Sequence, residues 1–234
     1  MTPSPLSCEH EDRMPTPIKT IFFDVGNTLL FPNRPHILKP LGKREVSLEH
    51  WHAIERETKP KFDEIVVHGG PADHGFWHMF YGRLLNDLQI ENNQLHASLV
   101  DATRISANWC DMRPGTCEAL RRIGKRFPLG IISNADGKVS AVLQGCGIAS
   151  CVQSITDSGV IGCEKPHPAI FEAALRTLHA NPEGSLYVGD VYSVDYLGAT
   201  RAGMQAMLFD VSGAYRDTGF PRVESLEELE KKLS

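Results

Sequence analysis

Five short runs of apolar residues, separated by helical patterns, constrain the fold of this chain most strongly. The runs are residues 18–24, 127–133, 151–156, 185–190 and 205–211. Four of them are mostly apolar and the third is weaker, a composition typical of strands buried on both faces. Helical patterns occupy residues 116–126, 137–147, 167–180, 194–204 and 224–233. Strands that alternate with helices pair in parallel, so we predict an α/β fold with a doubly wound parallel sheet.

Residues 34–112 interrupt this alternation. The segment is rich in histidine, tryptophan and charged residues, and we find no convincing strand in it. Its periodic pieces are helical and cover residues 47–62, 75–88 and 93–110. The predicted division of the chain is a disordered lead-in at 1–17, an α/β core at 18–33 and 113–234, and an inserted helical domain at 34–112.

Composition excludes several classes of protein. The 234 residues are 41% hydrophobic and 23% charged, which is typical of a soluble globular protein. The net charge of −5 argues against a surface for nucleic acid or anionic membrane. No apolar run approaches the ~18 residues of a membrane span, and the N-terminus has no apolar signal region. The six cysteines show no CxxC pair, so we expect reduced thiols, and we take a cytoplasmic location as the default. We expect a monomer or homodimer, although no feature of the sequence specifies the oligomeric state.

Polar residues stand where the apolar runs end. In the stretch TIFFDVGNTLL (20–30), the apolar run ends at Asp24, and a glycine and polar residues follow. The candidate site residues at this and the other ends are Asp24, Gly26, Thr28, Ser133, Asn134, Lys165, Asp190 and Asp195. Ligands of an open parallel sheet bind beyond the carboxyl ends of its strands, so we expect these side chains to lie together.

The chemistry of this set points to phosphoryl transfer. Closely packed carboxylates repel one another unless a cation neutralises them, and carboxylate oxygens with a backbone carbonyl suit Mg²⁺. Ser133, Lys165 and free backbone N–H groups can then hold an anionic group that the metal also touches. Asp24 would be placed to attack that group.

The sequence resembles the haloacid dehalogenase-like superfamily in four ordered motifs. These are DVGNTL (24–29), ISN (132–134), the lysine of CEKPHP (163–168) and VGDVYSVD (188–195). The resemblance implies a helical cap of the first type, formed by the insertion. It also implies that Asp24 is the nucleophile and that Ser133 and Lys165 bind the phosphoryl group. The implied Mg²⁺ ligands are Asp24, the carbonyl of Gly26, Asp190 and Asp195, and the expected substrate contacts are Thr28, Asn134 and Gly26.

Gly26 departs from the pattern of the phosphatases in this family, which place a second aspartate at that position. That aspartate protonates the leaving group and then activates water, and such acid–base catalysis typically contributes about 10²–10⁴-fold. Glycine therefore predicts slow turnover, a substrate with a good leaving group, or an acid supplied by the insertion. Histidine candidates there are His36, His52, His74 and His78. Arg34 and Lys39 could reach the site, but we expect them to be solvated.

Three functions remain open at this stage. The first is a Mg²⁺-dependent phosphatase that acts on a small phosphorylated molecule. The second is a metal-free 2-haloacid dehalogenase, against which the two acids of VGDVYSVD argue, or a phosphonatase that forms a Schiff base on Lys39 or Lys43. The third is a family member that binds a phosphorylated ligand or a protein without turnover.

Overall fold

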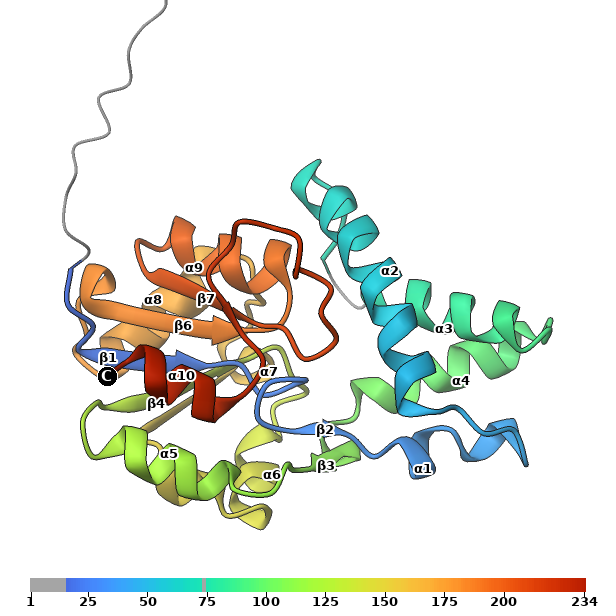
Figure 1. Ribbon diagram of the computed structural model, residues 1–234, viewed down its shortest axis with the longest axis horizontal. Coiled ribbons are helices and arrows are strands. Elements are labelled where there is room, and N and C mark those ends of the chain that lie inside the picture. Colours follow the sequence, from blue (N-terminus) through green and yellow to red (C-terminus); the bar gives the residue numbers. More distant parts are fainter. Residues whose placement is uncertain (1–15, 73–74) are drawn as a thin grey trace, which may run out of the picture.

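The computed structural model describes residues 16–72 and 75–234, and its central feature is a six-stranded sheet (Figure 1). The strands are β1 (Thr20–Phe23), β4 (Leu129–Ser133), β5 (Ser154–Asp157), β6 (Ser185–Gly189), β7 (Gln205–Phe209) and β8 (Arg222–Val223). Their order is β5-β4-β1-β6-β7-β8, and every neighbouring pair is parallel. The chain leaves β1 toward one edge and later returns to its other side, so the order reverses between β1 and β6. The predicted doubly wound α/β sheet is confirmed.

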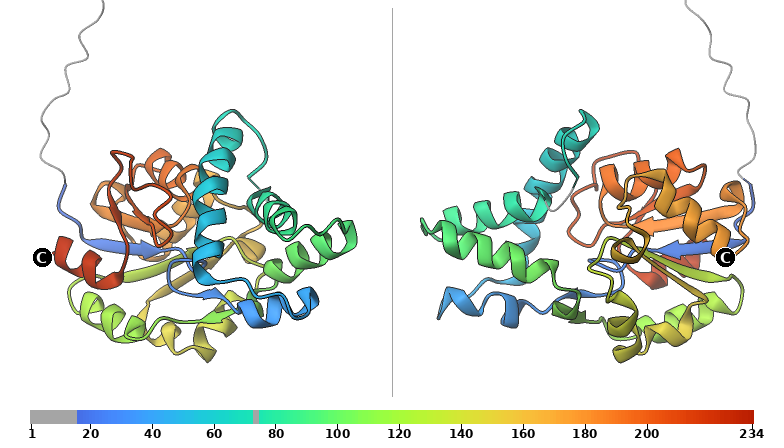
Figure 2. Two further views of the ribbon diagram at one scale, coloured as in Figure 1. Left: turned by 45° about the vertical axis from the view of Figure 1, so that its right-hand side comes forward. Right: turned by 180° about the vertical axis from the view of Figure 1, so that it is seen from behind.

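Helices cover both faces of the sheet (Figure 2). On one face lie α5 (Thr116–Gly124), α6 (Val139–Gly145) and α10 (Leu226–Lys232), and on the other lie α8 (Pro168–Thr177) and α9 (Leu197–Arg201). Successive strand residues point to opposite faces. Ile21 and Phe23 therefore join the apolar cluster of the first face, whereas Phe22 packs with α8 and α9 on the second.

Four helices, called the helical unit below, lie beyond the carboxyl ends of the central strands (Figures 1 and 2). They are α1 (Arg34–Ile37), α2 (Leu48–Val67), α3 (Gly75–Asp87) and α4 (Asn93–Arg104). The unit has its own apolar cluster, in which Trp51 packs against Phe80 with ring centroids 4.4 Å apart. The same cluster includes Val194, which follows β6, so the unit also packs against the α/β core.

Two short strands connect the helical unit to the sheet. They are β2 (Phe31–Pro32) and β3 (Trp109–Asp111), which pair antiparallel with an irregular register. The expectation that residues 34–112 contain no strand is therefore wrong for β3. Three residues are too few to show an alternating pattern, and this strand exists because tertiary structure brings the two linkers together. The division into core and inserted domain stays a prediction.

Other short elements complete the chain. They are the short helix α7 (Ser158–Ile161), a π-helical turn (Tyr192–Tyr196) and 3₁₀ turns at Lys39–Leu41, Ser106–Asn108, Ile148–Cys151 and Pro182–Gly184. The helix predicted at 194–204 is thus partly the π-helical turn and partly α9. The predicted disordered lead-in falls, except for Thr16 and Pro17, outside the described residues.

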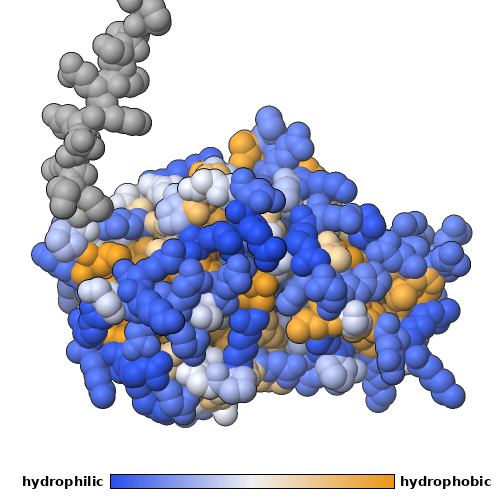
Figure 3. Space-filling model, in the orientation of Figure 1, coloured by the Kyte–Doolittle hydropathy of each residue, from blue (hydrophilic) through white to orange (hydrophobic). Residues whose placement is uncertain are grey.

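The surface in Figure 3 is mainly hydrophilic, with apolar residues scattered between charged ones. Over the described part of the chain, no helix combines the length and the hydropathy that crossing a membrane would require. The five cysteines within the described residues are free thiols.

Candidate active site

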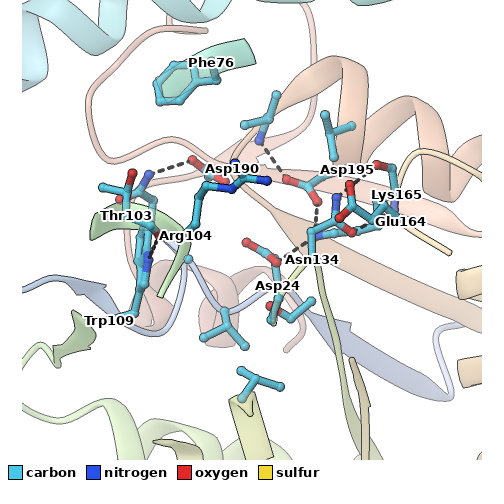
Figure 4. A pocket seen from close by; sticks show the side chains of 18 of the residues that line it. Asp24, Phe76, Thr103, Arg104, Trp109, Asn134, Glu164, Lys165, Asp190 and Asp195 are labelled. Atoms are coloured by element: carbon cyan, nitrogen blue, oxygen red, sulfur yellow. Dashed lines mark hydrogen bonds and ion pairs between the residues drawn. The ribbon is translucent and has the colours of Figure 1, made fainter. Parts of the chain in front are cut away.

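Three buried carboxylates meet at the carboxyl ends of β1 and β6 (Figure 4). Asp24 follows β1, Asp190 follows β6, and Asp195 belongs to the π-helical turn. Each contributes an oxygen, and these oxygens lie within 4.8 Å of one another. The structure therefore brings together the three acids that the sequence placed at strand ends.

Lys165 is the first cation of this cluster. Its Nζ donates hydrogen bonds to Asp24 Oδ1 at 2.6 Å, to Asp195 Oδ1 at 2.7 Å and to the Tyr187 hydroxyl at 2.8 Å. Burial alone would lower the pKa of Lys165, but the carboxylates of Asp195 and Asp24 outweigh it and raise the pKa above its ordinary value. Lys165 is therefore a fixed positive charge beside the predicted nucleophile.

Asn134 holds the backbone of Lys165 in place. The Asn134 amide donates to the carbonyl of Lys165 at 3.0 Å and accepts from its N–H at 2.7 Å. Ser133, directly before it at the end of β4, is buried. Both residues line the cavity described below, as expected of substrate-contacting residues.

Lys59 of α2 is a second cation, which sequence reasoning missed. Its Nζ donates to Asp190 Oδ2 at 2.8 Å and to the Asp190 carbonyl at 2.9 Å. The Asn27 amide donates to the same Oδ2 at 3.2 Å. Nothing in the periodicity of the insertion singles out Lys59, because its importance depends on how α2 packs against the sheet.

Negative charge exceeds positive charge in this cluster. Burial raises the pKa of Asp24 to about 7, even though Lys165 lowers it, and the nearby Asp195 and Asp190 add to the increase. Burial likewise raises the pKa of Asp190, against the effect of Lys59. Three carboxylates face two lysines, so a divalent cation would relieve the remaining repulsion. Hard oxygen donors without histidine or cysteine are the set that Mg²⁺ prefers.

A cavity of about 400 Å³ opens over this cluster (Figure 4). Its lower wall contains Asp24, Gly26, Ser133, Asn134, Lys165, Asp190 and Asp195. The helical unit supplies apolar side chains and Arg104 to the opposite wall. Thr28 is placed differently from the other predicted site residues: it is buried, it does not line the cavity, and its hydroxyl has no hydrogen-bond partner among the described residues.

Trp109 covers the position where Gly26 lacks a side chain. A Cβ on Gly26 would lie 3.2 Å from Cζ3 of the Trp109 indole, and Trp109 lines the same cavity. Its indole N–H donates to the Thr103 carbonyl at 2.7 Å, which fixes the ring. A side chain at position 26 would therefore press against the Trp109 ring from its first carbon.

The predicted histidines do not supply a replacement acid in the part of the chain that the structure describes. His36, His52 and His78 do not line this cavity, and His74 lies outside the described residues. Lys39 and Lys43, the predicted Schiff-base lysines, are exposed and are not part of the cavity wall either. The acids that line it besides the cluster are Asp136, which is bound to Ser106, and Glu164.

Comparison with known proteins agrees with the fold and the motif order. Residues 18–203 match the family model described as haloacid dehalogenase-like hydrolase. The glyceraldehyde 3-phosphate phosphatase of Methanothermobacter thermautotrophicus is 41% identical over 207 residues, which are 86% of this chain and 90% of that protein. The chain therefore belongs to the haloacid dehalogenase-like hydrolases, and the family resemblance is confirmed.

Solved structures show the same fold at low sequence identity. The HAD-hydrolase YfnB from Bacillus subtilis, bound to magnesium, has a TM-score of 0.67 and 17% identity, with 94% of this chain and 100% of that chain covered. The L-2-haloacid dehalogenase from Xanthobacter autotrophicus has a TM-score of 0.58 and 15% identity, with 92% and 97% covered. Because both share the fold, the fold alone does not separate the candidate reactions.

Proposed function

We propose that this hydrolase is a Mg²⁺-dependent phosphatase that acts on a small phosphorylated molecule through a phosphoaspartate on Asp24. The observation that carries the proposal is the position of Asp24. Its carboxylate accepts a hydrogen bond from the Lys165 ammonium, lies near two further buried acids, and lines a cavity large enough for a metabolite. The relatives named as glyceraldehyde 3-phosphate phosphatases support a phosphorylated substrate.

Each residue of the cluster has a role in this proposal. Asp24, Asp190, Asp195 and the Gly26 carbonyl would hold Mg²⁺, which supplies positive charge to the phosphoryl oxygens when bound. Lys165 holds Asp24 through Oδ1 and adds charge for the phosphoryl group. Ser133 lines the cavity beside it and is placed to donate to that group.

The reaction proceeds in two displacements. A carboxylate oxygen of Asp24 attacks phosphorus, and the bond from phosphorus to the leaving oxygen breaks with its electron pair on that oxygen. Water then attacks the phosphorus of the aspartyl phosphate. This releases inorganic phosphate and restores the Asp24 carboxylate.

The surroundings of the leaving group favour substrates whose leaving oxygen departs without being protonated by an acid. Gly26 provides no carboxylate, and the Trp109 ring lies against this position. A leaving oxygen of low basicity departs without protonation, whereas an alkoxide needs it. We therefore expect faster turnover of acyl and aryl phosphates than of alkyl phosphates such as glyceraldehyde 3-phosphate.

The helical unit is proposed to act as a cap over this site. Phe62, Phe76 and Trp77 of α2 and α3 line the cavity opposite the carboxylates. An apolar wall that excludes water strengthens the electrostatic interactions beneath it. The cytoplasmic location and the state of a monomer or homodimer stay predictions.

Phosphate release tests the proposal. Acetyl phosphate, p-nitrophenyl phosphate and glyceraldehyde 3-phosphate are compared with and without Mg²⁺, and Asp24→Asn is the control. We expect Mg²⁺-dependent turnover that Asp24→Asn abolishes. Absence of turnover with all three substrates, in protein shown by calorimetry to bind Mg²⁺, would contradict it. Chelator-resistant release of chloride from 2-chloropropionate would support the dehalogenase alternative instead.

A further inference from the structure

A second cavity, of about 250 Å³, lies where the two linkers join the helical unit to the sheet. Its wall includes Phe31 from the first linker, Arg34 from the start of α1, Arg113 from the second linker, Trp51 and His52 from α2, and Phe209 from the end of β7. We call it the hinge cavity. The volume lies just below the roughly 300–1,000 Å³ typical of sites for drug-sized ligands, so it suits a smaller molecule. The phosphatase reaction proposed above makes no use of it.

Arg34 supplies an unsatisfied cation to the hinge cavity. The side chain is half-buried, its guanidinium lies 5.8 Å from the Trp51 ring centroid, and its Nη1 is buried without a hydrogen-bond partner among the described residues. The expectation that Arg34 is solvated is therefore wrong for this nitrogen. A buried charged donor without an acceptor is unfavourable, and an anion in the cavity beside this guanidinium would offset its positive charge.

Arg113 adds a second positive charge from the second linker. Its guanidinium lies 4.8 Å from the Phe31 ring centroid, and Nη1 donates to the Glu224 carbonyl at 3.3 Å. Within the described ranges, neither Arg34 nor Arg113 forms an ion pair. The pKa of His52, in the same wall, is lowered mainly by burial and next by the positive charge of Arg113. This agrees with a positive potential there.

Two acids also line the hinge cavity, and neither forms an ion pair with these arginines among the described residues, although Glu55 acts on Arg113 as a nearby negative charge. Glu55 is buried in α2, one turn before Lys59, and Asp111 is exposed. Lys59 lines the cavity too, but its charge is already paired with Asp190. The wall therefore combines two arginines that form no ion pair with aromatic and aliphatic side chains.

We propose that the hinge cavity binds a small organic anion, with a carboxylate or phosphate head on a short apolar body. The head would pair with Arg34 and Arg113, whose planar guanidinium groups match either oxyanion. The body would pack against Phe31 and Trp51. Such an occupant contacts both linkers, α2 and the end of β7 at once, so it holds the helical unit against the sheet.

Calorimetry without Mg²⁺ or substrate tests binding directly. Phenylacetate and phenylphosphonate are the probes, and they separate a carboxylate head from a phosphate head. Arg34→Met keeps the length of the side chain and removes its charge. Arg44→Met is the matched control, because Arg44 is exposed and does not line the cavity. Phenylphosphonate can also enter the active site, so only binding that Arg34→Met weakens is assigned to the hinge cavity.

We expect the wild-type protein and Arg44→Met to bind at least one probe equally, with a Kd of about 1 mM or below. Arg34→Met should weaken that binding roughly 10- to 100-fold, the loss expected for a charge-assisted hydrogen bond. Thermal melting confirms that each variant is folded, and Arg113→Met provides a second variant with the same expected loss. No binding of either probe to wild-type protein, or binding to either arginine variant that is as tight as to the wild-type protein, would overturn the proposal.

Amide hydrogen exchange tests whether the occupant holds the hinge. The probe that binds should slow exchange in β2 and β3 of the wild-type protein but not in Arg34→Met. Unchanged exchange in both strands at saturating probe would refute the holding role. Neither readout depends on turnover, so failure of this proposal is distinguishable from failure of the phosphatase proposal.

Discussion

We predict that Gly26→Asp combined with Trp109→Leu speeds the hydrolysis of substrates with poor leaving groups. A Cβ at position 26 would lie 3.2 Å from the Trp109 ring, closer than ordinary contact. Gly26→Asp alone should therefore overpack the site and lower the free energy of unfolding by about 1–3 kcal/mol. Leucine at position 109 removes the ring and leaves room for the carboxylate.

The gain should depend on the leaving group. A positioned acid contributes about 10²–10⁴-fold when the leaving oxygen needs a proton, which corresponds to roughly 3–5 kcal/mol of barrier. We expect an increase of that order for glyceraldehyde 3-phosphate and little change for p-nitrophenyl phosphate. The assay is kcat/KM for both substrates in Mg²⁺, measured from phosphate release.

The control separates the acid from the altered packing. Gly26→Asn with Trp109→Leu introduces a side chain of the same shape without an ionisable carboxyl group, and it should give no gain. Equal acceleration of both substrates, or equal acceleration by the asparagine and aspartate variants, would refute the reasoning. So would a folded aspartate variant that shows no gain on glyceraldehyde 3-phosphate.

Three further predictions concern the charges of the cluster. Because burial raises the pKa of Asp24 to about 7 from 3.8, the folded metal-free protein binds a proton that the unfolded chain has released. Its stability should therefore fall by roughly 3 kcal/mol more than that of Asp24→Asn as the pH rises from 4 to 7, as measured by urea unfolding; equal pH profiles would contradict it. Lys59→Met leaves Asp190 without its ion-pair partner and should destabilise the metal-free protein by about 3–5 kcal/mol. Lys61→Met is the control, because Lys61 is exposed on the same helix and its loss should not change stability. Equal unfolding midpoints of the two variants would argue against a structural role for the pair of Lys59 and Asp190. Lys165→Met should remove at least about 10²-fold of kcat/KM with the fold retained, and a variant with near wild-type activity would exclude Lys165 from the reaction.

Five of the six strands of the sheet, and their ends, could be predicted from the sequence because their signals are local; the two-residue β8 carries no such signal. An apolar run followed by an acid or a serine specifies both a buried strand and the group at its tip, as at Asp24, Ser133 and Asp190. The parallel order of such strands then brings the tips together. No knowledge of side-chain packing was needed for these residues.

The contributions of the helical unit and of its connecting strands could not be predicted, because they depend on how these elements pack against the sheet. Lys59 reaches Asp190 from α2, and Trp109 covers Gly26 from β3, although both pairs are far apart in the chain. The three described candidate histidines were proposed from composition alone and lie away from the main cavity. Thr28 follows the nucleophile closely in sequence, yet the turn after β1 buries it.

Trapping the aspartyl phosphate tests the central claim most directly. The protein is mixed with Mg²⁺ and acetyl phosphate, quenched, reduced with borohydride and digested, and the peptide that contains residue 24 is analysed by mass spectrometry. We predict conversion of Asp24 to homoserine, the product of reducing an aspartyl phosphate, with none when Mg²⁺ is omitted. Phosphate release that continues while residue 24 stays unreduced would contradict nucleophilic attack by Asp24.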